Sequence, residues 1–339
     1  MREFVSVIIP CRNESAFLGA CLDSVLAADY PRERMEVVVA DGMSEDGTRE
    51  LIERYTARDA RVRRVDNPQR ITPVALNRAV AASRGEIILR LDAHAEMAPH
   101  HISRAVDYLR SSAADNVGGG IETVARDRGP FAEPIRMVLA HRFGVGNSHF
   151  RTGAAAPRWV DTVFGGCWRR EVFDRLGGFN EKLVRGQDLE FNLRLRNSGG
   201  RILLAPDLET RYYARATLPS FWRHNWSNGV WVLLAFAFSE VMPVRLRHLA
   251  PLAFVCALGL GTAAVGFAHW ILPAIALPYL ALNLGASTQA AWRERNWKLL
   301  FLLPVTFLSL HVPYGAGSLW GALQAAAIAF RKLLPERAQ

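Results

Sequence analysis

The sequence predicts an α/β domain with a largely parallel sheet, followed by apolar helical segments. Short apolar runs rich in β-branched residues alternate with segments of helical periodicity through about the first 92 residues. Such alternation is typical of a sheet with helices on both faces. Half of the 339 residues are hydrophobic, and the excess lies in the last third of the chain. The length allows one enzyme domain of about 240 residues and a smaller region.

Four strands are expected in the first part of the chain. They cover residues 5–9, 35–40, 61–65 and 86–91. Pro10 ends the first strand, and Asn13 or Ser15 caps the helix that follows it. A turn-rich segment then precedes the second helix. Thr72 caps the third helix, because the proline that follows, Pro73, suits the first helical position.

Three polar residues follow the fourth strand at alternating positions, namely Asp92, His94 and Glu96. An extended backbone places all three on one face, and open α/β sheets bind ligands at the carboxyl ends of their strands. Carboxylate oxygens with one imidazole suit Mn²⁺ or Mg²⁺ that is also bound by a substrate phosphate. The sequence therefore indicates a metal site here, and a solvated loop after a strand is the alternative.

Four segments stand in a fixed order along the chain: residues 5–14, 40–48, 92–94 and 164–190. Their order and spacing resemble the motifs of family 2 glycosyltransferases, which bind nucleotide sugars and have the GT-A fold. The resemblance covers residues 4–215 and implies a Rossmann-like mixed sheet with helices on both faces. Residues 67–77 and the Asp-Ala-His-Ala form of the third motif are most similar to the succinoglycan-type exopolysaccharide glucosyltransferase subgroup.

Two positions depart from the family pattern. Ala40 stands where the family usually has the first of two adjacent aspartates, and Asp41 matches the second. His94 replaces the second acid of the usual Asp-x-Asp metal motif. Neutral imidazole is a good ligand for a transition metal and a poor one for Mg²⁺. The departure therefore favours Mn²⁺ over Mg²⁺ and predicts weaker metal binding at low pH, where His94 is protonated.

The resemblance implies a role for residues in each motif. The donor-binding positions are Pro10, Arg12, Glu14, Asp41 and Asp92, with Glu14 and Asp41 at the base or ribose. A metal held by Asp92, His94 and Glu96 would bridge the donor phosphates. Asp188 matches the family's catalytic base, so displacement in line would invert the anomeric carbon. An acid that stabilises the start of a helix is the alternative for Asp188.

The expected acceptor contacts are Gly165, Gly166, Gln187, Arg151, Arg223 and Trp226. Arg151 lies in a polar stretch with Arg142 and His149 that could bind a lipid diphosphate, and a flexible loop with solvated charges is equally consistent. Residues 221–226 loosely resemble the Gln-x-x-Arg-Trp motif of processive family members, but the glutamine is missing, which favours one sugar per encounter. An interfacial helix with aromatic side chains among lipid headgroups is the other interpretation of this segment.

Three apolar runs in the last third of the chain predict membrane-spanning helices. They cover residues 249–268, 270–290 and 299–330. The first has 20 residues without a charge, and as a helix it would be about 30 Å long, which matches a bilayer core. Prolines and glycines in the third run allow a hairpin or a re-entrant element instead. A wholly buried core helix is the alternative for any single run.

The net charge of +9 could suggest a nucleic-acid partner, but its distribution argues against one. Residues 241–339 hold eight Lys/Arg and two acids, a net +6, and these charges flank the apolar runs. Positive flanks are typically cytoplasmic, so we expect the enzyme domain on the cytoplasmic side of a bacterial-type inner membrane. The side of the last residues stays open, because a single third crossing places them outside whereas Arg331 and Lys332 favour the inside.

These observations predict a cytoplasmic glycosyltransferase domain at 1–215, an interfacial segment at 216–247 and a membrane region at 248–331. The expected enzyme is an inverting transferase that moves a hexose, glucose from UDP-glucose being favoured, to a glycan on polyprenyl diphosphate. A synthase that forms a polyprenyl-phosphate sugar is the first alternative. A non-catalytic membrane protein that binds sugar nucleotides is the second. Apolar segments without buried charges make a transporter a poor interpretation.

Overall fold

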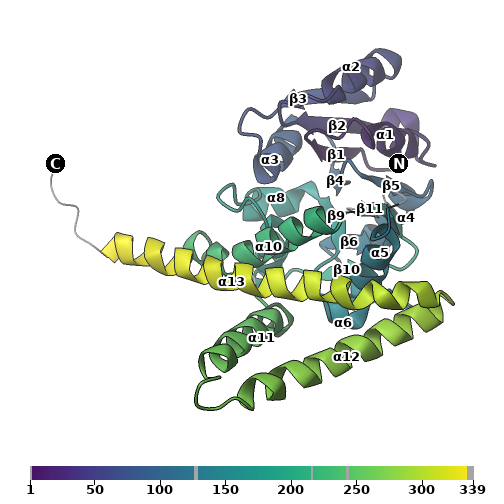
Figure 1. Ribbon diagram of the computed structural model, residues 1–339. Coiled ribbons are helices and arrows are strands. Elements are labelled where there is room, and N and C mark those ends of the chain that lie inside the picture. Colours follow the sequence, from purple (N-terminus) through teal and green to yellow (C-terminus); the bar gives the residue numbers. More distant parts are fainter. Residues whose placement is uncertain (1, 126–128, 215–216, 242–243, 334–339) are drawn as a thin grey trace. The chain divides into compact units, whose positions relative to one another are not determined.

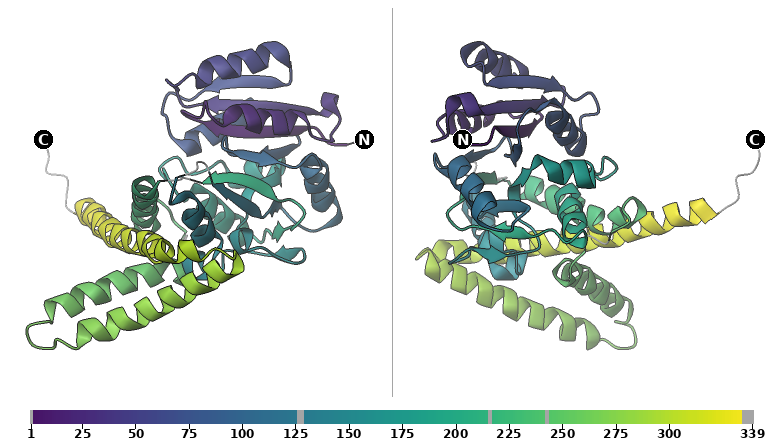
Figure 2. Two further views of the ribbon diagram at one scale, coloured as in Figure 1. Left: turned by 45° about the vertical axis from the view of Figure 1, so that its right-hand side comes forward. Right: turned by 180° about the vertical axis from the view of Figure 1, so that it is seen from behind.

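The computed structural model describes residues 2–125, 129–214, 217–241 and 244–333. They form two compact units (Figure 1, Figure 2). The first unit contains residues 1–122 and 149–213, and the second contains 123–148 and 214–339. The end of the first unit lies near the expected boundary at 215. The described residues within 123–148, which the sequence places in the glycosyltransferase domain, cluster with the second unit.

The described residues of the first unit form an eight-stranded mixed sheet in the order β3-β2-β1-β4-β9-β6-β10-β8. Its strands are β1 (Val5–Cys11), β2 (Met35–Asp41), β3 (Val62–Asp66), β4 (Ile87–Arg90), β6 (Asn116–Gly119), β8 (Arg158–Trp159), β9 (Phe164–Arg169) and β10 (Ile202–Leu204). The four strands predicted from the sequence are present, and neighbours among them pair in parallel. β9 runs antiparallel to both β4 and β6, which makes the sheet mixed. A smaller sheet contains β5 (Ala95–Met97), β11 (Thr210–Ala214) and β7 (Ile121–Ala125).

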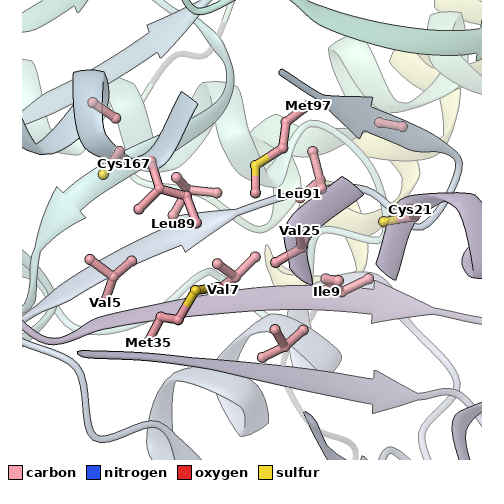
Figure 3. Packing of buried hydrophobic residues seen from close by; sticks show 14 of the residues in the cluster. Val5, Val7, Ile9, Cys21, Val25, Met35, Leu89, Leu91, Met97 and Cys167 are labelled. Carbon is pink, nitrogen blue, oxygen red and sulfur yellow. The ribbon is translucent and has the colours of Figure 1, made fainter. Parts of the chain in front are cut away.

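Helices cover both faces of the large sheet. They are α1 (Leu18–Leu26), α2 (Thr48–Arg58), α3 (Thr72–Ala82), α4 (His101–Ser111), α8 (Arg170–Leu176) and α9 (Gln187–Asn197), with a short η1 (Arg32–Arg34) and α7 (His149–Thr152). Alternate residues of a strand point to opposite faces. Val7 and Ile9 accordingly join a core with α1, α2 and α4, whereas Ile8 joins a second core with α3, α8 and α9. Figure 3 shows Val7 and Ile9 beside Val25 of α1 in the first core.

Three local predictions at helix and strand ends were wrong. β1 continues through Pro10 to Cys11, because proline keeps its carbonyl acceptor and an extended backbone. Phe17 is the N-cap of α1, so neither Asn13 nor Ser15 caps that helix. α3 begins at Thr72 itself, after an extended Ile71, and no side chain caps it. The first two differences reflect bonds to distant residues, because β1 stays paired with β2 through Cys11 and Asn13 bonds the Glu45 amide.

The described residues of the second unit are mainly helical. The helices are α5 (Ala132–Ala140), α6 (Arg142–Val145), α10 (Leu218–Leu234), η2 (Ala235–Ala237), α11 (Leu246–Ala263), α12 (Ile271–Arg293), η3 (Trp297–Phe301) and α13 (Leu303–Leu333). Arg136 of α5 pairs with Glu294 at 2.7 Å. The carbonyl of Phe143 in α6 lies 3.0 Å from Nε2 of His311 in α13. These bonds, together with a shared apolar core, explain why residues 123–148 belong to this unit.

Three glycines let α10 and α13 pack backbone against backbone. A Cβ on Gly229 would lie 2.0 Å from the carbonyl oxygen of Tyr314, one on Gly317 would lie 2.3 Å from that of Trp226, and one on Gly321 would lie 2.1 Å from that of Val230. A side chain at any of these positions therefore requires the helices to separate. Trp226 faces Gly317, Val230 faces Gly321 and Ala237 lies near Lys332, so the two helices run in the same direction.

The three apolar runs that were expected to span a membrane form α11, α12 and α13. Of the helices in the described part of the chain, α12 is the one that is both long enough and apolar enough to cross a bilayer. The apolar part of α11 is shorter, from Arg247 to Ala263. Three spans were predicted, and one of the three helices, α12, has the length and composition of a membrane span.

We expect Gly321→Leu to destabilise the second unit, because the new side chain would meet the α10 backbone. Overpacking of this kind typically costs about 1–3 kcal/mol. Gly285→Leu is the matched control, since a Cβ at Gly285 on α12 meets no atom within 4 Å. Thermal unfolding of both variants in the same detergent would measure the difference. Equal melting temperatures would contradict the close packing of α10 and α13.

Candidate active site

The sequence motifs meet at one edge of the large sheet. β1 ends at Cys11 opposite Asp41, the last residue of β2. β4 ends at Arg90, which lies beside Ile8 of β1. Because these strands are parallel, the segments that follow them leave the sheet at the same edge, as expected for a ligand site in an open α/β sheet.

The loop after β1 is bonded to the turn after β2. Asn13 has a positive φ of 54°, and its side-chain oxygen accepts a hydrogen bond from the Glu45 amide at 3.0 Å. The backbone amide of Asn13 donates to Ser44 Oγ at 2.9 Å, and that of Glu14 donates to Thr48 Oγ1 at 2.9 Å. Asn13 therefore holds two loops together instead of capping a helix.

Asp41 is fully buried and bonded to the chain's own groups. Its carboxylate accepts hydrogen bonds from the Ser44 amide and from Nη1 of Arg49, the latter at 3.1 Å. Arg49 also pairs with Asp66 at 3.1 Å. Asp41 therefore fixes the turn and orients Arg49. The charged side chain that reaches the surface here is that of Arg49, a residue that the sequence analysis did not predict.

The expected metal cluster is not formed. Asp92 accepts hydrogen bonds from Arg90, His94 Nδ1 lies 3.0 Å from Glu14 Oε1, and Glu96 bonds the hydroxyl of Tyr213. No three His, Cys, Asp or Glu side chains within the described ranges could together hold a metal. The three side chains were expected to share one face of an extended backbone. They do not, because β5 starts at Ala95 and pairs with β11, so Glu96 belongs to the smaller sheet.

His94 and Glu14 form an ion pair. Burial alone lowers the pKa of His94, but the hydrogen bond to Glu14 and the nearby Tyr212 and Asp92 outweigh burial and raise this pKa to about 10. His94 is accordingly an imidazolium at neutral pH in this arrangement. A protonated imidazole cannot ligate a metal, so the arrangement does not support the expected loss of metal binding near the ordinary pKa of histidine.

Arg90 joins the third and fourth motifs. Its Nε and Nη2 donate to Asp92 Oδ1 at 3.2 and 2.9 Å, and its Nη1 donates to Asp188 Oδ1. Asp188 lies in the first turn of α9. Burial raises the pKa of Asp188, while the charge of Arg90 opposes this shift. The predicted base and the predicted donor residue Asp92 are therefore brought together by a residue that the motifs did not identify.

The chain was compared with known protein families and proteins. Residues 6–177 match the family model described as glycosyl transferase family 2. The chain is 31% identical over 314 residues to the succinoglycan biosynthesis protein ExoA of Rhizobium meliloti, covering 92% of each protein.

The chain belongs to glycosyl transferase family 2.

Other relatives are more distant. The glycosyltransferase AglE of Haloferax volcanii is 29% identical over 208 residues, which is 60% of this chain and 65% of that protein. Among solved structures, the mannosyltransferase PcManGT from Pyrobaculum calidifontis, in complex with GDP-Man and Mn²⁺, matches with a TM-score of 0.53 and 23% identity over 99% of this chain and 89% of that chain. This likeness shows the fold, so the GT-A prediction is confirmed.

In this glycosyltransferase the glycines of β9 have a structural role. Gly165 and Gly166 have φ values of 64° and 120°, a region that favours glycine. A Cβ on Gly165 would lie 2.7 Å from the Arg90 carbonyl oxygen, and one on Gly166 would lie 2.3 Å from the Trp168 ring. These glycines thus allow β9 to approach Arg90, and the expected contact with an acceptor stays a prediction.

The remaining predicted acceptor residues fall in different places. The Arg151 guanidinium lies over Tyr212, 5.9 Å from its ring centre, and Tyr212 meets the edge of His94 at 5.0 Å. Nη1 of Arg151 is buried without a hydrogen-bond partner. Gln187 is buried at the start of α9. Arg223 and Trp226 are exposed on α10 in the second unit, and Arg142 also belongs to that unit.

The His94–Glu14 pair predicts a dependence of stability on pH. A pKa raised to about 10 in the folded state stabilises the fold fully below the unfolded pKa of about 6.5. That stabilisation is lost as the pH rises through 10. When the pH is raised from about 6.5 to about 10, we expect the melting temperature of His94→Gln to fall by less than that of the wild type. His100→Gln, at an exposed histidine of α4's N-cap, is the control and should follow the wild type.

Proposed function

We propose that this glycosyltransferase transfers a hexose, favoured as glucose from UDP-glucose, to a glycan on a lipid diphosphate in exopolysaccharide biosynthesis. The full-length similarity to a succinoglycan biosynthesis protein supports the pathway class. Lipid-linked acceptors are supported by a relative in Methanococcus voltae that is named as a glucuronosyltransferase for a dolichyl N-acetylglucosaminyl phosphate. It is 25% identical over 235 residues, 67% of this chain and 72% of that protein. The single observation that carries the proposal is the joining of Asp92 and Asp188 through Arg90.

Asp188 is proposed as the general base. The acceptor hydroxyl oxygen attacks the anomeric carbon of the donor while its proton passes to a carboxylate oxygen of Asp188. The bond from that carbon to the diphosphate breaks, and its electron pair leaves with the nucleoside diphosphate. Attack opposite the leaving group inverts the configuration. Partial burial and the neighbouring charge of Asp92 raise the pKa of Asp188, which makes it a stronger proton acceptor than an ordinary aspartate.

Charged groups of this chain are suited to the diphosphate. Protonated His94 and Arg151, whose Nη1 is buried without a hydrogen-bond partner, both contact the ring of Tyr212. A cation without a full set of partners gains most from an anionic ligand in a low-dielectric site. We infer that these two side chains bind phosphate oxygens of the donor or of the lipid acceptor.

A divalent metal would be held by Asp92 together with the donor diphosphate. Metal ions at phosphate substrates commonly use one or two protein carboxylates, so the lone Asp92 fits such a site although the described residues form no three-ligand group. When bound, the metal would neutralise charge on the departing diphosphate. The expected preference for Mn²⁺ over Mg²⁺ depended on His94 as a ligand, and His94 is bonded to Glu14 here.

We propose that α11 and α12 form a hairpin across the cytoplasmic membrane. α12 has the required length and composition, and Trp292 and Trp297 are exposed near its end, as is typical of residues at a membrane interface. Arg293, Arg295 and Lys298 follow within the same short stretch and favour the cytoplasmic side. The catalytic unit is then cytoplasmic, where nucleotide sugars are made.

α13 is better suited to the interface than to a third crossing. It runs alongside α10, and Lys332 Nζ lies 3.4 Å from the Ala237 carbonyl oxygen. The chain from α10 to the bend after η2 carries exposed charges at Arg223 and Glu240, which are 17 positions apart. As one continuous helix this stretch would be about 26 Å long, less than the roughly 30 Å of a bilayer core. Because α13 packs along α10, we infer that both helices lie in the headgroup region, where these charges stay solvated.

A topology measurement tests this membrane arrangement. We expect a reporter fused after Gln339 to lie on the same side of the membrane as one fused before Arg2. A tag inserted into the 264–270 loop between α11 and α12 should lie on the opposite side. A reporter after Gln339 on the opposite side would show that α13 crosses the membrane.

We expect Asp188→Asn to lower turnover by about 10²-fold or more while donor affinity changes little, because the amide keeps the shape but cannot accept the proton. Asp174→Asn on α8 is the control, since that side chain is exposed. Membranes supplied with labelled sugar nucleotides, followed by lipid extraction, provide the assay. Normal turnover by Asp188→Asn would refute the base assignment. An extracted product with one sugar and one phosphate would identify a polyprenyl-phosphate sugar synthase instead.

A further inference from the structure

We propose that Arg90 is a positioning residue that holds the base Asp188 and the donor residue Asp92 at a fixed separation, using one oxygen of each. This inference rests on the proposed function of Asp188 as the base. It adds a requirement that neither the motifs nor the comparisons assign, namely that an arginine on β4 must bind both carboxylates for the base to act.

The backbone at Arg90 is rigidly placed. Arg90 is the last residue of β4, which lies between β1 and β9 in the middle of the sheet. The next amide, that of Leu91, donates to the Ile8 carbonyl at 3.1 Å. On the other side, β9 approaches so closely that a Cβ on Gly165 would lie 2.7 Å from the Arg90 carbonyl oxygen. The start of the side chain is therefore fixed by two neighbouring strands.

The guanidinium is buried, with 7% of the residue exposed. A buried charge without a partner is strongly unfavourable. Arg90 meets this requirement with two carboxylates that lie on different elements: Asp92 follows β4 directly, and Asp188 begins α9. Because a guanidinium is a planar group with donors in fixed directions, binding both carboxylates also sets the distance and angle between them.

The choice of atoms leaves each carboxylate available for chemistry. Nε and Nη2 of Arg90 bind Oδ1 of Asp92, and Nη1 binds Oδ1 of Asp188. In the described part of the chain, the side-chain hydrogen bonds of both aspartates use Oδ1 alone. Oδ2 of Asp188 can thus accept the proton, and Oδ2 of Asp92 can face the donor, while Arg90 keeps both side chains in one rotamer.

Among the residues that the structure describes, Arg90 is the side-chain hydrogen-bond partner of Asp188. Gly186, directly before α9, adopts a φ of 77°, so the helix starts from a turn. The Asp188 side chain is 40% exposed. Without Arg90 it would be free to turn towards water, and its repulsion from Asp92 would favour that movement. A displacement of about 1 Å at a reacting group can cost on the order of 10² in rate.

A double-mutant cycle on the full-length chain in membranes tests this inference. The variants are Arg90→Gln, Asp188→Asn and their combination, assayed with UDP-glucose for kcat and KM. We expect Arg90→Gln alone to lower kcat by about 10²-fold. In the Asp188→Asn background the same change should lower kcat by less than about threefold, because the base that Arg90 positions is already absent.

Arg90→Lys is the conservative variant. It keeps a positive charge in the strand, but an ammonium group cannot bind two carboxylates with the geometry of a guanidinium. We expect Arg90→Lys to fold and to lower kcat as Arg90→Gln does. This loss should again occur only where Asp188 is intact. Arg90→Lys therefore carries the same test if Arg90→Gln does not fold. Recovery of wild-type kcat by Arg90→Lys would show that charge alone suffices and would overturn the inference.

Arg63→Gln is the matched control. Arg63 on β3 binds the buried Glu36 through Nε and Nη2 at 3.2 and 2.8 Å, so it resembles Arg90 as a structural ion pair at another place in the sheet. We expect it to lower the melting temperature but to leave kcat unchanged. An equal loss of kcat from Arg90→Gln in both backgrounds would overturn the positioning role and leave the base assignment intact. Normal turnover by Asp188→Asn would overturn both.

Discussion

The buried guanidinium of Arg90 is the charge around which the candidate active site is organised. A charge inside an apolar sheet requires anionic partners, and the two partners that Arg90 finds are the acid after its own strand and the acid at the start of α9. Gly165 allows β9 to lie close to the backbone of Arg90. The ion pairs that stabilise the buried charge of Arg90 are therefore the same contacts that position Asp92 and Asp188 at the edge of the sheet.

The other side of the site is rigid for a different reason. Here the loops after β1 and β2 are held by hydrogen bonds between side chains and backbone amides, with Asn13, Ser44 and Thr48 as the partners. Buried Asp41 and Arg49 complete this arrangement. Because these groups are bonded to one another, this side of the site is largely preorganised. Preorganised dipoles and charges lose little free energy to rearrangement when a substrate binds.

The second unit combines helices that are far apart in the sequence. Residues 123–148 leave the first unit and pack with α12 and α13 through Arg136–Glu294, His311 and an apolar core. Glycines bring α10 and α13 into backbone contact. A segment that is inserted within the catalytic chain therefore belongs structurally to the proposed membrane-associated part.

The sequence by itself determined the four parallel strands, the meeting of the motifs at their carboxyl ends, the family and the apolar helices, because periodicity and turn residues report local burial. It did not determine the partners of His94, Glu96 and Asn13, or the role of Arg90. Those depend on residues such as Glu14, Tyr213 and Asp188, which lie far away in the chain. Only the tertiary structure decides such pairs, since the choice among competing charged and polar groups depends on distance and burial in the folded state.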